Sequence, residues 1–406
     1  MIIFSNEYLS NLPKSKHPAK GGPANFAKRF KKFLKGDKTK HRWIGIIFQC
    51  SQITAPKLKK ILTSNQETYY LLNLPRDWFK EIEQAKKPIN PEKIFAPAIN
   101  SIARILTKSK SEVVFLNGYA LTNWLILRAA AQANIPIAIQ HAGIWTKELE
   151  MYKDFFSSAG KKMMKEMEQE ISKLASAEIF LNDFSRRFYV KNVARPQKNK
   201  THIIPLPLDF DNYYYSRHPR WPHNNIENFE IGIISRWDRI KNHEAILALA
   251  KEASRRKLPW RFYAVTTIPD TSKKKQFKSA YRKYVKLVPP LDQKGVEKFC
   301  QLSDLIIVPS HFDVSPNVVL ESVACGTPVA ISTNVGFVDD FKSCDARDWI
   351  IDFSNPTKAI KAIDKITGKK MPSTLVRNLK NKHKSSRVFK SYLRLFKKLT
   401  NDQKKK

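Results

Sequence analysis

The sequence of 406 residues is poor in cysteine and has no closely spaced cysteine pair. Its four cysteines are Cys50, Cys300, Cys325 and Cys344, and no two of them form a C-x-x-C motif. This spacing argues against a disulfide scaffold and a zinc finger, and a reducing compartment fits it best. We expect Cys325, which lies among small residues, to fill space in a core.

Long apolar runs are also missing. The most apolar long window, Trp124–Ile139, is interrupted by polar residues and is too short to cross the roughly 30 Å hydrocarbon core of a bilayer. The first residues do not resemble a signal peptide, because no basic region precedes an apolar stretch. We therefore expect a cytoplasmic protein that is soluble or peripheral on the inner membrane face.

Acidic residues are scarce relative to basic ones. Asp and Glu total 36 against 73 Lys and Arg, which gives a net charge of +37. Such a field attracts nucleic acid, anionic lipid headgroups or phosphorylated substrates. The excess is spread over both halves and is densest in residues 357–406. A lysine-rich proteome would give the same composition without any anionic partner, so charge alone does not identify the partner.

Short β-branched runs alternate with helical patterns along the whole chain. The expected strands are Met1–Ser5, Trp43–Gln49, Val113–Asn117, Ile135–Gln140, Ala177–Asn182, Glu230–Ser235, Arg261–Thr267, Leu305–Pro309 and Pro328–Ser332. The expected helices are Asn25–Leu34, Asn123–Ala133, Lys161–Leu174, Asn242–Arg256, Val318–Ala324 and a tail over Leu375–Leu399. This alternation predicts an α/β fold with parallel sheets covered on both faces, one doubly wound layer structure in each half.

Four prolines between residues 203 and 228 interrupt the periodicity. Proline fixes φ and lacks an N–H group, so this stretch is neither a helix interior nor a central strand. We therefore expect a first domain over 1–205, a connection over 206–228 and a second domain over 229–375. Residues 376–406 form a helical, basic tail.

The most informative segment runs from a buried strand through a loop into a short helix, over residues 305–329. Asp313 lies on the loop and Glu321 about one turn into the helix, where Asn317 is expected to cap the start. Backbone N–H groups at such a start favour an anion, and carboxylates bind vicinal hydroxyls. The alternative is that the acidic residues complement the helix dipole, with Glu321 on a solvent-exposed face.

A second segment places two cations after the strand that opens the second half. Arg236 and Lys241 flank the loop that leads into the next helix. A guanidinium and an ammonium at the carboxyl end of a strand can bind a diphosphate and neutralise it as it departs. By itself this spacing is weak evidence, because 73 basic residues produce it by chance.

Together the two segments resemble the signature of retaining family 4 (group 1) glycosyltransferases, which have the GT-B fold. Glu321 matches the glutamate that holds the nucleotide ribose in that family, and Asp313 takes the place of the glutamate that reaches the donor sugar. Arg236 and Lys241 match the family's phosphate-binding element, with serine at its first glycine and asparagine at its last.

The resemblance extends less closely over residues 1–205. The paired glycines Gly21 and Gly22 precede the first helix, where similar proteins line the diphosphate pocket with a glycine-rich loop. His141 lies just past a strand end and matches a histidine near the donor sugar. The expected donor-binding residues are Gly21, Gly22, Ser315, Asn317 and Val318.

The resemblance implies two doubly wound Rossmann-like domains facing a central cleft, with a C-terminal helix that crosses back to the first domain. It also implies transfer of a sugar from a nucleotide-diphosphate sugar to a hydroxyl of a lipid-linked acceptor or cell-envelope glycan, with retention of configuration. The departing diphosphate takes the proton, so no enzyme nucleophile is needed. We expect no cofactor and no metal, because the sequence has no H-E-x-x-H motif, no phosphate-binding P-loop and no Asp-x-Asp motif in a suitable loop.

Two questions stay open at this point. The segment Phe26–Lys35 is either a basic amphipathic helix on an anionic membrane or the first helix of the domain, with its phenylalanines packed on the sheet. Two other functions compete with transfer: binding of a nucleotide sugar without catalysis, and nucleic-acid binding, which no recognised motif supports. The donor base, the sugar and the acceptor are not specified by the sequence.

Overall fold

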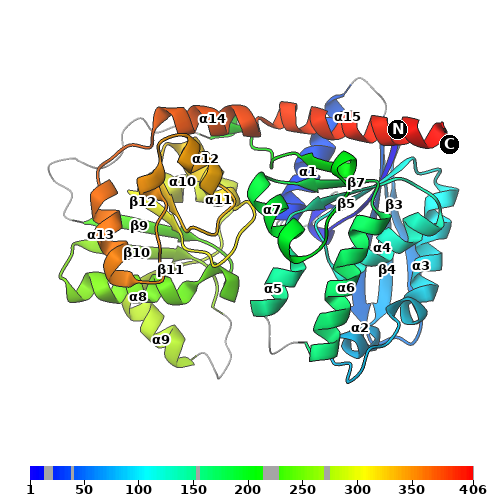
Figure 1. The fold of residues 1–406 in the computed structure, drawn as a ribbon, viewed down its shortest axis with the longest axis horizontal. Coiled ribbons are helices and arrows are strands. Elements are labelled where there is room, and N and C mark those ends of the chain that lie inside the picture. The colour runs from blue at the N-terminus through cyan, green and yellow to red at the C-terminus, as the bar shows by residue number, and fades with distance from the viewer. Residues whose placement is uncertain (13–21, 38–40, 152–155, 214–227, 269–274, 406) are drawn as a thin grey trace. The chain divides into compact units, whose positions relative to one another are not determined.

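The computed structural model describes residues 1–12, 22–37, 41–151, 156–213, 228–268 and 275–405. The chain forms two compact units, shown in Figure 1. Unit 1 consists of Met1–Pro205 together with Ser386–Lys406, and unit 2 consists of Leu206–Ser385. Each unit has its own sheet, and the two units are described separately below.

Unit 1 is built on an eight-stranded sheet with the order β3-β4-β2-β1-β5-β6-β7-β8. All neighbouring strands are parallel except β3 and β4, which are antiparallel. The strands are β1 (Ile2–Asn6), β2 (Arg42–Ser51), β3 (Lys57–Thr63), β4 (Glu67–Pro75), β5 (Val113–Asn117), β6 (Ile137–His141), β7 (Ala177–Phe180) and β8 (Thr201–Ile203). The five predicted strands are all present, whereas β3, β4 and β8 were not predicted.

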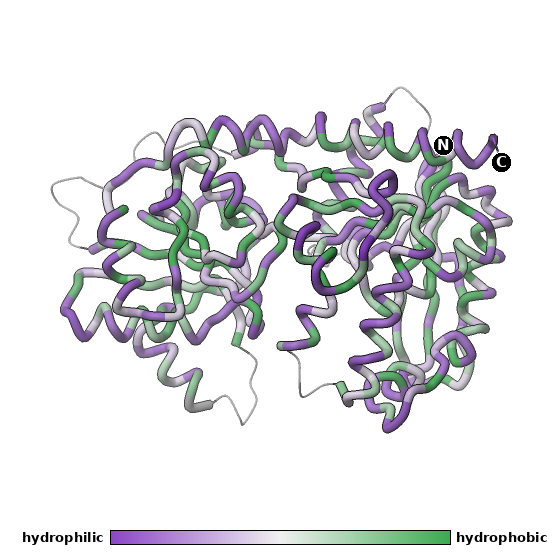
Figure 2. Tube along the Cα trace, in the orientation of Figure 1, coloured by the Kyte–Doolittle hydropathy of each residue, from purple (hydrophilic) through white to green (hydrophobic). Residues whose placement is uncertain are grey.

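Helices cover both faces of this sheet, as doubly wound topology requires. They are α1 (Gly22–Gly36), α2 (Arg76–Glu83), α3 (Pro91–Lys108), α4 (Leu121–Gln132), α5 (Trp145–Met151), α6 (Ser158–Leu174), α7 (Asp183–Asn192) and α15 (Ser385–Lys404). One face carries α3, α4 and α6 on a core that includes Phe4, Ile46 and Leu116. Figure 2 shows the apolar residues of the strands enclosed by mixed helices.

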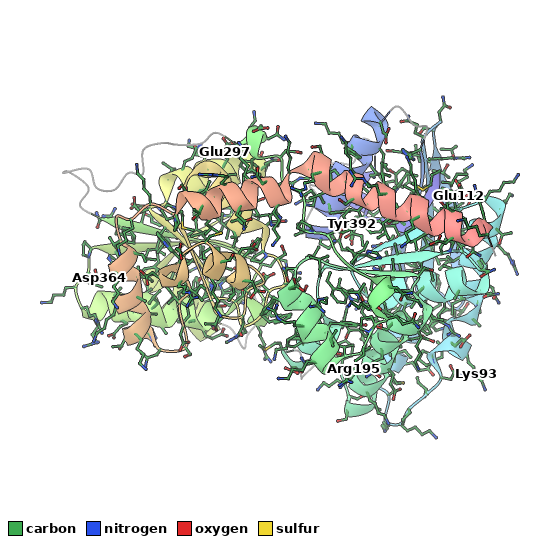
Figure 3. All side chains as sticks on the ribbon, turned by 45° about the horizontal axis from the view of Figure 1, so that its top comes forward. Lys93, Glu112, Arg195, Glu297, Asp364 and Tyr392 are labelled. Carbon is green, nitrogen blue, oxygen red and sulfur yellow. The ribbon has the colours of Figure 1, made fainter. Side chains whose placement is uncertain are left out.

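The other face carries α1 and α15 side by side. Phe26 and Phe30 of α1 are buried, and the ring of Phe30 stacks on Phe389 of α15 with centroids 5.1 Å apart. The Phe30 ring also lies 6.1 Å from Phe115 of β5. The hydroxyl of Tyr392, labelled on α15 in Figure 3, donates to the side chain of Gln140 on β6. The buried phenylalanines of α1 therefore pack within unit 1.

Unit 2 is built on a five-stranded parallel sheet with the order β11-β10-β9-β12-β13. The strands are β9 (Phe229–Ile234), β10 (Trp260–Val265), β11 (Val285–Val288), β12 (Leu305–Val308) and β13 (Val329–Ile331). The helices are α8 (His243–Arg255), α9 (Lys275–Tyr284), α10 (Gln293–Leu302), α11 (Asn317–Cys325), α12 (Val338–Ser343), α13 (Pro356–Ile366) and α14 (Ser373–His383). Helix α8 packs against α13, and α10 packs against α11.

The first residues of the unit 2 segment belong to its core. Leu208 and Tyr213 are buried in that core, although they lie in the stretch predicted as a connection, and residues 214–227 of that stretch lie outside the described residues. Within the sheet, Gly232 of β9 accommodates a close approach, because a Cβ there would lie 2.5 Å from Ser303 Oγ. Cys325 is fully buried in the same core.

The C-terminal region differs from its prediction as one helical stretch over 375–399. Two helices, α14 and α15, are separated at Lys384, whose φ of −56° and ψ of 117° are not helical. Unit 2 ends with α14, and Ser386–Lys406 belongs to unit 1. No helix among the residues described is both long enough and apolar enough to span a bilayer.

A buried histidine fastens the end of α14 to the start of unit 2. His383 Nδ1 donates to the Leu206 carbonyl oxygen at 2.7 Å, and the Leu208 N–H donates to the His383 carbonyl oxygen at 2.8 Å. Burial lowers the pKa of His383 from 6.5 to about 4. The imidazole is therefore neutral in the folded protein at pH 7.

The lowered pKa of His383 predicts a loss of stability in mild acid. The unfolded chain binds the proton near pH 6.5 and the folded chain only near pH 4, so stability falls as pH decreases through this window. Between pH 8 and pH 5 the wild type should lose about 2 kcal/mol more than His383→Gln. Urea unfolding at both pH values measures this. His311→Gln, at an exposed position, is the control, and equal pH dependence of wild type and His383→Gln would contradict the assignment.

Candidate functional site

The two predicted motif segments leave the unit 2 sheet at the same edge. Strand β9 pairs in parallel with β12, so the loops that follow both strands start side by side at their carboxyl ends. The order of the sheet also changes direction here, because the chain runs from β9 to β10 on one side and from β12 to β13 on the other. Ligands in open α/β sheets bind at such a point.

Lys241 and Asp313 connect these two loops. The Lys241 ammonium donates to Asp313 Oδ2, and the two residues are 72 positions apart. Both side chains are largely buried, with 19% and 11% exposed. The other carboxylate oxygen of Asp313 accepts from the Ser315 N–H at 3.3 Å. The structure thus brings together a cation and an anion that the sequence analysis selected from separate motifs.

Helix α11 begins beside this pair, and its start differs from the prediction in one respect. Asn317 does not cap the helix, because it is already the first helical residue, and Pro316 occupies the cap position without a side-chain hydrogen bond. The carbonyl oxygen of Pro316 accepts from the Val319 N–H at 3.2 Å. A proline cap supplies no side-chain acceptor, so the cap residue of α11 makes no hydrogen bond to the N–H groups at this helix start.

Ser315 adds a second feature at the start of α11. Its side chain is buried, and its hydroxyl has no hydrogen-bond partner among the described residues. Buried hydroxyls are normally hydrogen-bonded. A buried hydroxyl beside an uncapped helix start is therefore suited to an anion-binding site.

Glu321 lies one turn further into α11 and is half-buried. Its Oε1 accepts from the Tyr213 hydroxyl at 3.4 Å. It is therefore not on a fully solvent-exposed face, which was the alternative to a binding role. Sequence analysis did not select Tyr213, and the only signal it offered was a run of tyrosines between prolines.

Arg236 follows β9 and extends into solvent, with 74% of its side chain exposed. Its Nη2 lies 3.6 Å from Asp238 Oδ2, and Asp238 Oδ1 accepts from the Ile240 N–H. His243 fixes the same loop, because its Nε2 lies 3.0 Å from the Arg236 carbonyl oxygen. Burial lowers the pKa of His243, so Nε2–H of the neutral ring donates to that carbonyl.

Asn242 explains the asparagine at the end of the phosphate-binding element, where the resembling family has glycine. Its backbone is left-handed, with a φ of 58°, which glycine and asparagine adopt more readily than other residues. Its side-chain oxygen accepts from the Ala245 N–H at 3.2 Å, and Nδ2 donates to the Pro309 carbonyl at 3.1 Å. Asn242 therefore caps α8 and ties it to the loop after β12.

The predicted site residues of unit 1 fall in different surroundings. Gly21 lies outside the described residues, and Gly22 is the first residue of α1. His141 was expected just past a strand end, but it is the last residue of β6 and its side chain is fully buried, so its role near a donor sugar stays a prediction. It stacks on Phe180 with ring centroids 4.4 Å apart, and its Nε2 lies 3.1 Å from Glu178 Oε2. The reason is that its side chain points to the sheet face that α7 covers through Tyr189, 4.5 Å away.

No group of three or more His, Cys, Asp and Glu side chains within the described ranges is arranged to hold a metal ion. The independence from metal implied by the resemblance stays a prediction.

Comparison with known proteins agrees with this geometry. Residues 220–384, which lie within unit 2, match the family model described as "Glycosyl transferases group 1". The matched range includes Lys241, Asp313 and Glu321. A search of curated protein sequences finds no match to the chain.

Solved structures resemble the chain along almost its whole length. A sucrose-phosphate synthase from Thermosynechococcus elongatus matches with a TM-score of 0.73 at 14% identity, covering 99% of both chains. A UDP-forming α,α-trehalose-phosphate synthase from Burkholderia xenovorans, in complex with glucose-6-phosphate, has a TM-score of 0.65 at 13% identity, covering 97% of this chain and 99% of that one. An Anabaena protein in complex with UDP-glucose has a TM-score of 0.64 at 12% identity, covering 98% and 99%. These likenesses confirm the predicted GT-B fold.

The left-handed backbone at Asn242 gives a stability prediction. Asn242→Ala removes two hydrogen bonds and forces alanine into this conformation, so it should lower the free energy of unfolding by about 2–3 kcal/mol. Asn242→Gly loses the hydrogen bonds but not the backbone fit, and should cost about 1 kcal/mol. Urea unfolding of both variants measures the difference.

The matched control is Asn355, which caps α13 through the Lys358 N–H but has an ordinary φ of −119°. There the alanine variant should cost about 1 kcal/mol and the glycine variant a few tenths of a kcal/mol, so the two should differ by less than they do at position 242. If alanine were as well tolerated as glycine at position 242, the left-handed conformation would not matter to stability.

Proposed function

We propose that the protein is a hexosyltransferase that moves a sugar from a nucleotide-diphosphate sugar to an acceptor hydroxyl with retention of configuration. The observation that carries the proposal is the Lys241–Asp313 contact beside the uncapped start of α11. It places a cation, helix N–H groups and a carboxylate together at the carboxyl ends of two neighbouring strands. This combination can bind a diphosphate that bears a sugar.

The roles follow from the chemistry of each group. Lys241 and the N-terminal N–H groups of α11 bind the diphosphate, and the exposed guanidinium of Arg236 closes over it. Glu321 accepts hydrogen bonds from the vicinal hydroxyls of the ribose, and Asp313 from a hydroxyl of the donor sugar.

These cations can replace a metal at the leaving group. Negative charge develops on the diphosphate as the bond to the sugar breaks, and fixed positive groups stabilise that charge without reorganisation. The departing phosphate oxygen takes the proton of the attacking hydroxyl, and attack on the same face preserves the configuration. No enzyme nucleophile is required in this scheme, and none was found in the sequence.

The comparisons suggest which donor to test first. The similar Anabaena structure contains UDP-glucose, and the Burkholderia enzyme is UDP-forming. We therefore propose a uridine nucleotide sugar as donor. For the acceptor we propose a lipid-linked or polysaccharide hydroxyl of a cell-envelope glycan.

The proposal predicts donor turnover that depends on Lys241. Release of nucleoside diphosphate from UDP-, GDP- and ADP-sugars should be detected for at least one donor. Lys241→Ala should lower kcat about 100-fold, the loss typical of removing one charge-stabilising donor. Glu321→Ala should mainly raise KM for the donor, because the ribose contact is present in both ground and transition states.

Lys361→Ala, at an exposed lysine of α13, is the matched control and should retain wild-type turnover. Activity of Lys241→Ala within threefold of wild type would contradict the proposed site. Donor binding without turnover in the wild type would favour a protein that binds nucleotide sugars without catalysis.

An exposed basic surface on unit 1 supports a peripheral membrane location. We call it the α1–α15 basic face, and it consists of Lys28, Lys32, Arg387, Lys390, Arg394, Lys397 and Lys398, all exposed. In the described part of the chain none of these seven residues has an ion pair. Helix α1 has no acidic residue and α15 has only Asp402. Each such cation contributes about 1 kcal/mol near an anionic leaflet.

Vesicle sedimentation tests this location. The protein should bind vesicles with 30% anionic lipid at low salt and not neutral ones, and the variant with Lys390, Arg394, Lys397 and Lys398 changed to Glu should bind at least tenfold more weakly. The control changes the same number of exposed basic residues, Lys86, Lys87, Lys93 and Lys108, to Glu. Equal losses in both variants would mean that net charge, and not this face, drives binding.

A further inference from the structure

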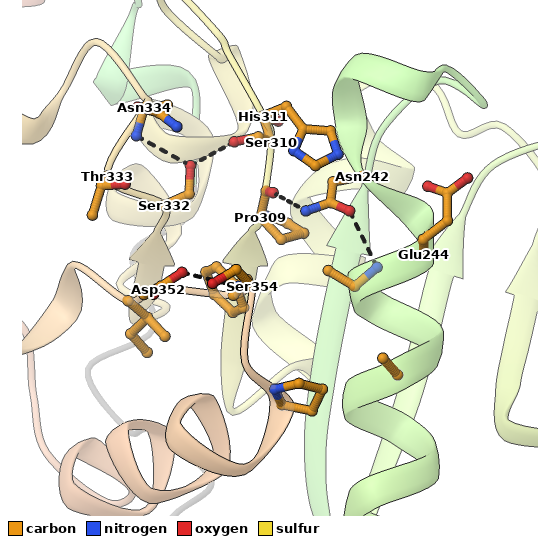
Figure 4. A pocket seen from close by; sticks show the side chains of 15 residues that line it. Asn242, Glu244, Pro309, Ser310, His311, Ser332, Thr333, Asn334, Asp352 and Ser354 are labelled. Carbon is orange, nitrogen blue, oxygen red and sulfur yellow. Dashed lines mark hydrogen bonds between the residues drawn. The ribbon is translucent and has the colours of Figure 1, made fainter.

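A cavity in unit 2 lies close to the proposed donor site but on the other side of the sheet. Its volume is about 360 Å³, and it opens where β12, β13 and the start of α8 meet (Figure 4). Right-handed crossovers that run in opposite directions from the switch point place α8 and α11 on opposite faces. The cavity lies on the α8 side, whereas the uncapped helix start belongs to α11.

Internal hydrogen bonds hold the wall of this cavity in place. The Ser332 hydroxyl donates to the Ser310 carbonyl at 2.6 Å, and the Asn242 side chain bonds to both Pro309 and Ala245, as Figure 4 shows. Asn242, Ser310 and Ser332 are buried. The wall is therefore preformed, as ligand sites in proteins usually are.

The lining combines an apolar floor with a polar rim. Ala245, Ala248, Pro309, Phe353 and Pro356 supply the apolar surface. The rim carries the exposed groups Glu244, His311, Thr333, Asn334, Asp352 and Ser354. A pyranose ring has the matching chemistry, because its C–H face is apolar while its edge bears hydroxyls that donate to carboxylates.

The charge of the lining disfavours phosphate. None of the described residues that line the cavity is Lys or Arg, although these two types make up 73 of the 406 residues. Two carboxylates, Glu244 and Asp352, line it instead, and hydrogen bonds from Ser354 lower the pKa of Asp352. Both groups repel an anion at neutral pH and accept hydrogen bonds from a neutral polyol.

We infer that this cavity binds one neutral sugar unit of a glycan, separately from the nucleotide sugar. As a consequence of the proposed transferase function, the bound unit belongs to the acceptor. Because the cavity and the α11 start are on opposite faces, this unit is not the one that receives the transferred sugar. It anchors a longer acceptor whose reactive hydroxyl lies further along the chain of sugars.

The test measures binding of glucose, galactose, mannose and glucose-6-phosphate to the full-length protein by ligand-observed NMR. At least one neutral hexose should bind saturably, and glucose-6-phosphate at least tenfold more weakly than glucose. Ala248→Trp, which fills the cavity, and Asp352→Asn should each weaken hexose binding at least tenfold. Lys251→Trp on the same helix and Asp348→Asn, both at exposed positions outside the cavity, should change it less than twofold.

Three results would overturn the inference: no saturable hexose binding, hexose binding by Ala248→Trp within twofold of wild type, or equal binding of glucose and glucose-6-phosphate. UDP binding, measured on the same samples, reports separately on the proposed function. It should be lost in Lys241→Ala and retained in Ala248→Trp. UDP binding by none of the proteins, wild type included, together with hexose binding that the cavity variants weaken, would support the sugar site. The same result would contradict its proposed role in binding an acceptor.

Discussion

The contact between Lys241 and Asp313 neutralises two charges that would otherwise lie largely buried at a strand edge. Each charge alone would carry a desolvation cost, and together they fix the loop after β9 against the loop after β12. Ser315, the start of α11 and the helical turn that carries Glu321 come directly after Asp313 in the chain. The geometry of the whole candidate site therefore depends on this one pair.

A bound diphosphate would change the partner of Lys241 without leaving it unpaired. The ammonium would exchange a carboxylate for a phosphate oxygen, and Asp313 would then be available to a sugar hydroxyl. Charge stays balanced in both states, so the site can be preformed without being blocked. This also gives a physical reason for the aspartate: its short side chain reaches Lys241 while its other oxygen holds the Ser315 N–H.

Charge is distributed unevenly around unit 1 and unit 2 despite a net charge of +37. The α1–α15 basic face concentrates cations over two helices whose apolar sides are already packed on the sheet. The cavity beside α8, by contrast, is lined by two carboxylates and no cation among its described residues. We interpret the first as a surface for an anionic membrane and the second as a site for a neutral sugar. The net charge alone does not locate either surface.

The sequence predicted most of what apolar periodicity and local spacing control. The five strands predicted in unit 1 and the four predicted in unit 2 are present, because buried parallel strands are short, continuous apolar runs. Strand β3 was missed, since Lys57, Lys59 and Lys60 make it read as a polar loop. The division between α14 and α15 was missed because Lys384, unlike glycine or proline, gives no local signal for a helix end.

The site was predicted in the same uneven way. Lys241, Asp313 and Glu321 were selected because residue type, strand position and the resemblance agreed. The burial of His141 was not foreseen, since it depends on Glu178 and Phe180, which come from a neighbouring strand. Tyr213 and the cavity beside α8 were likewise invisible, because each combines residues that are far apart in the sequence.

The most direct test of the central claim is a crystal structure of the protein with UDP bound. The account predicts that the β-phosphate lies within hydrogen-bond distance of Lys241 Nζ and of the backbone N–H groups at the start of α11, with the ribose hydroxyls on Glu321. A diphosphate bound elsewhere, with the Lys241–Asp313 pair unchanged and α11 unliganded, would contradict it.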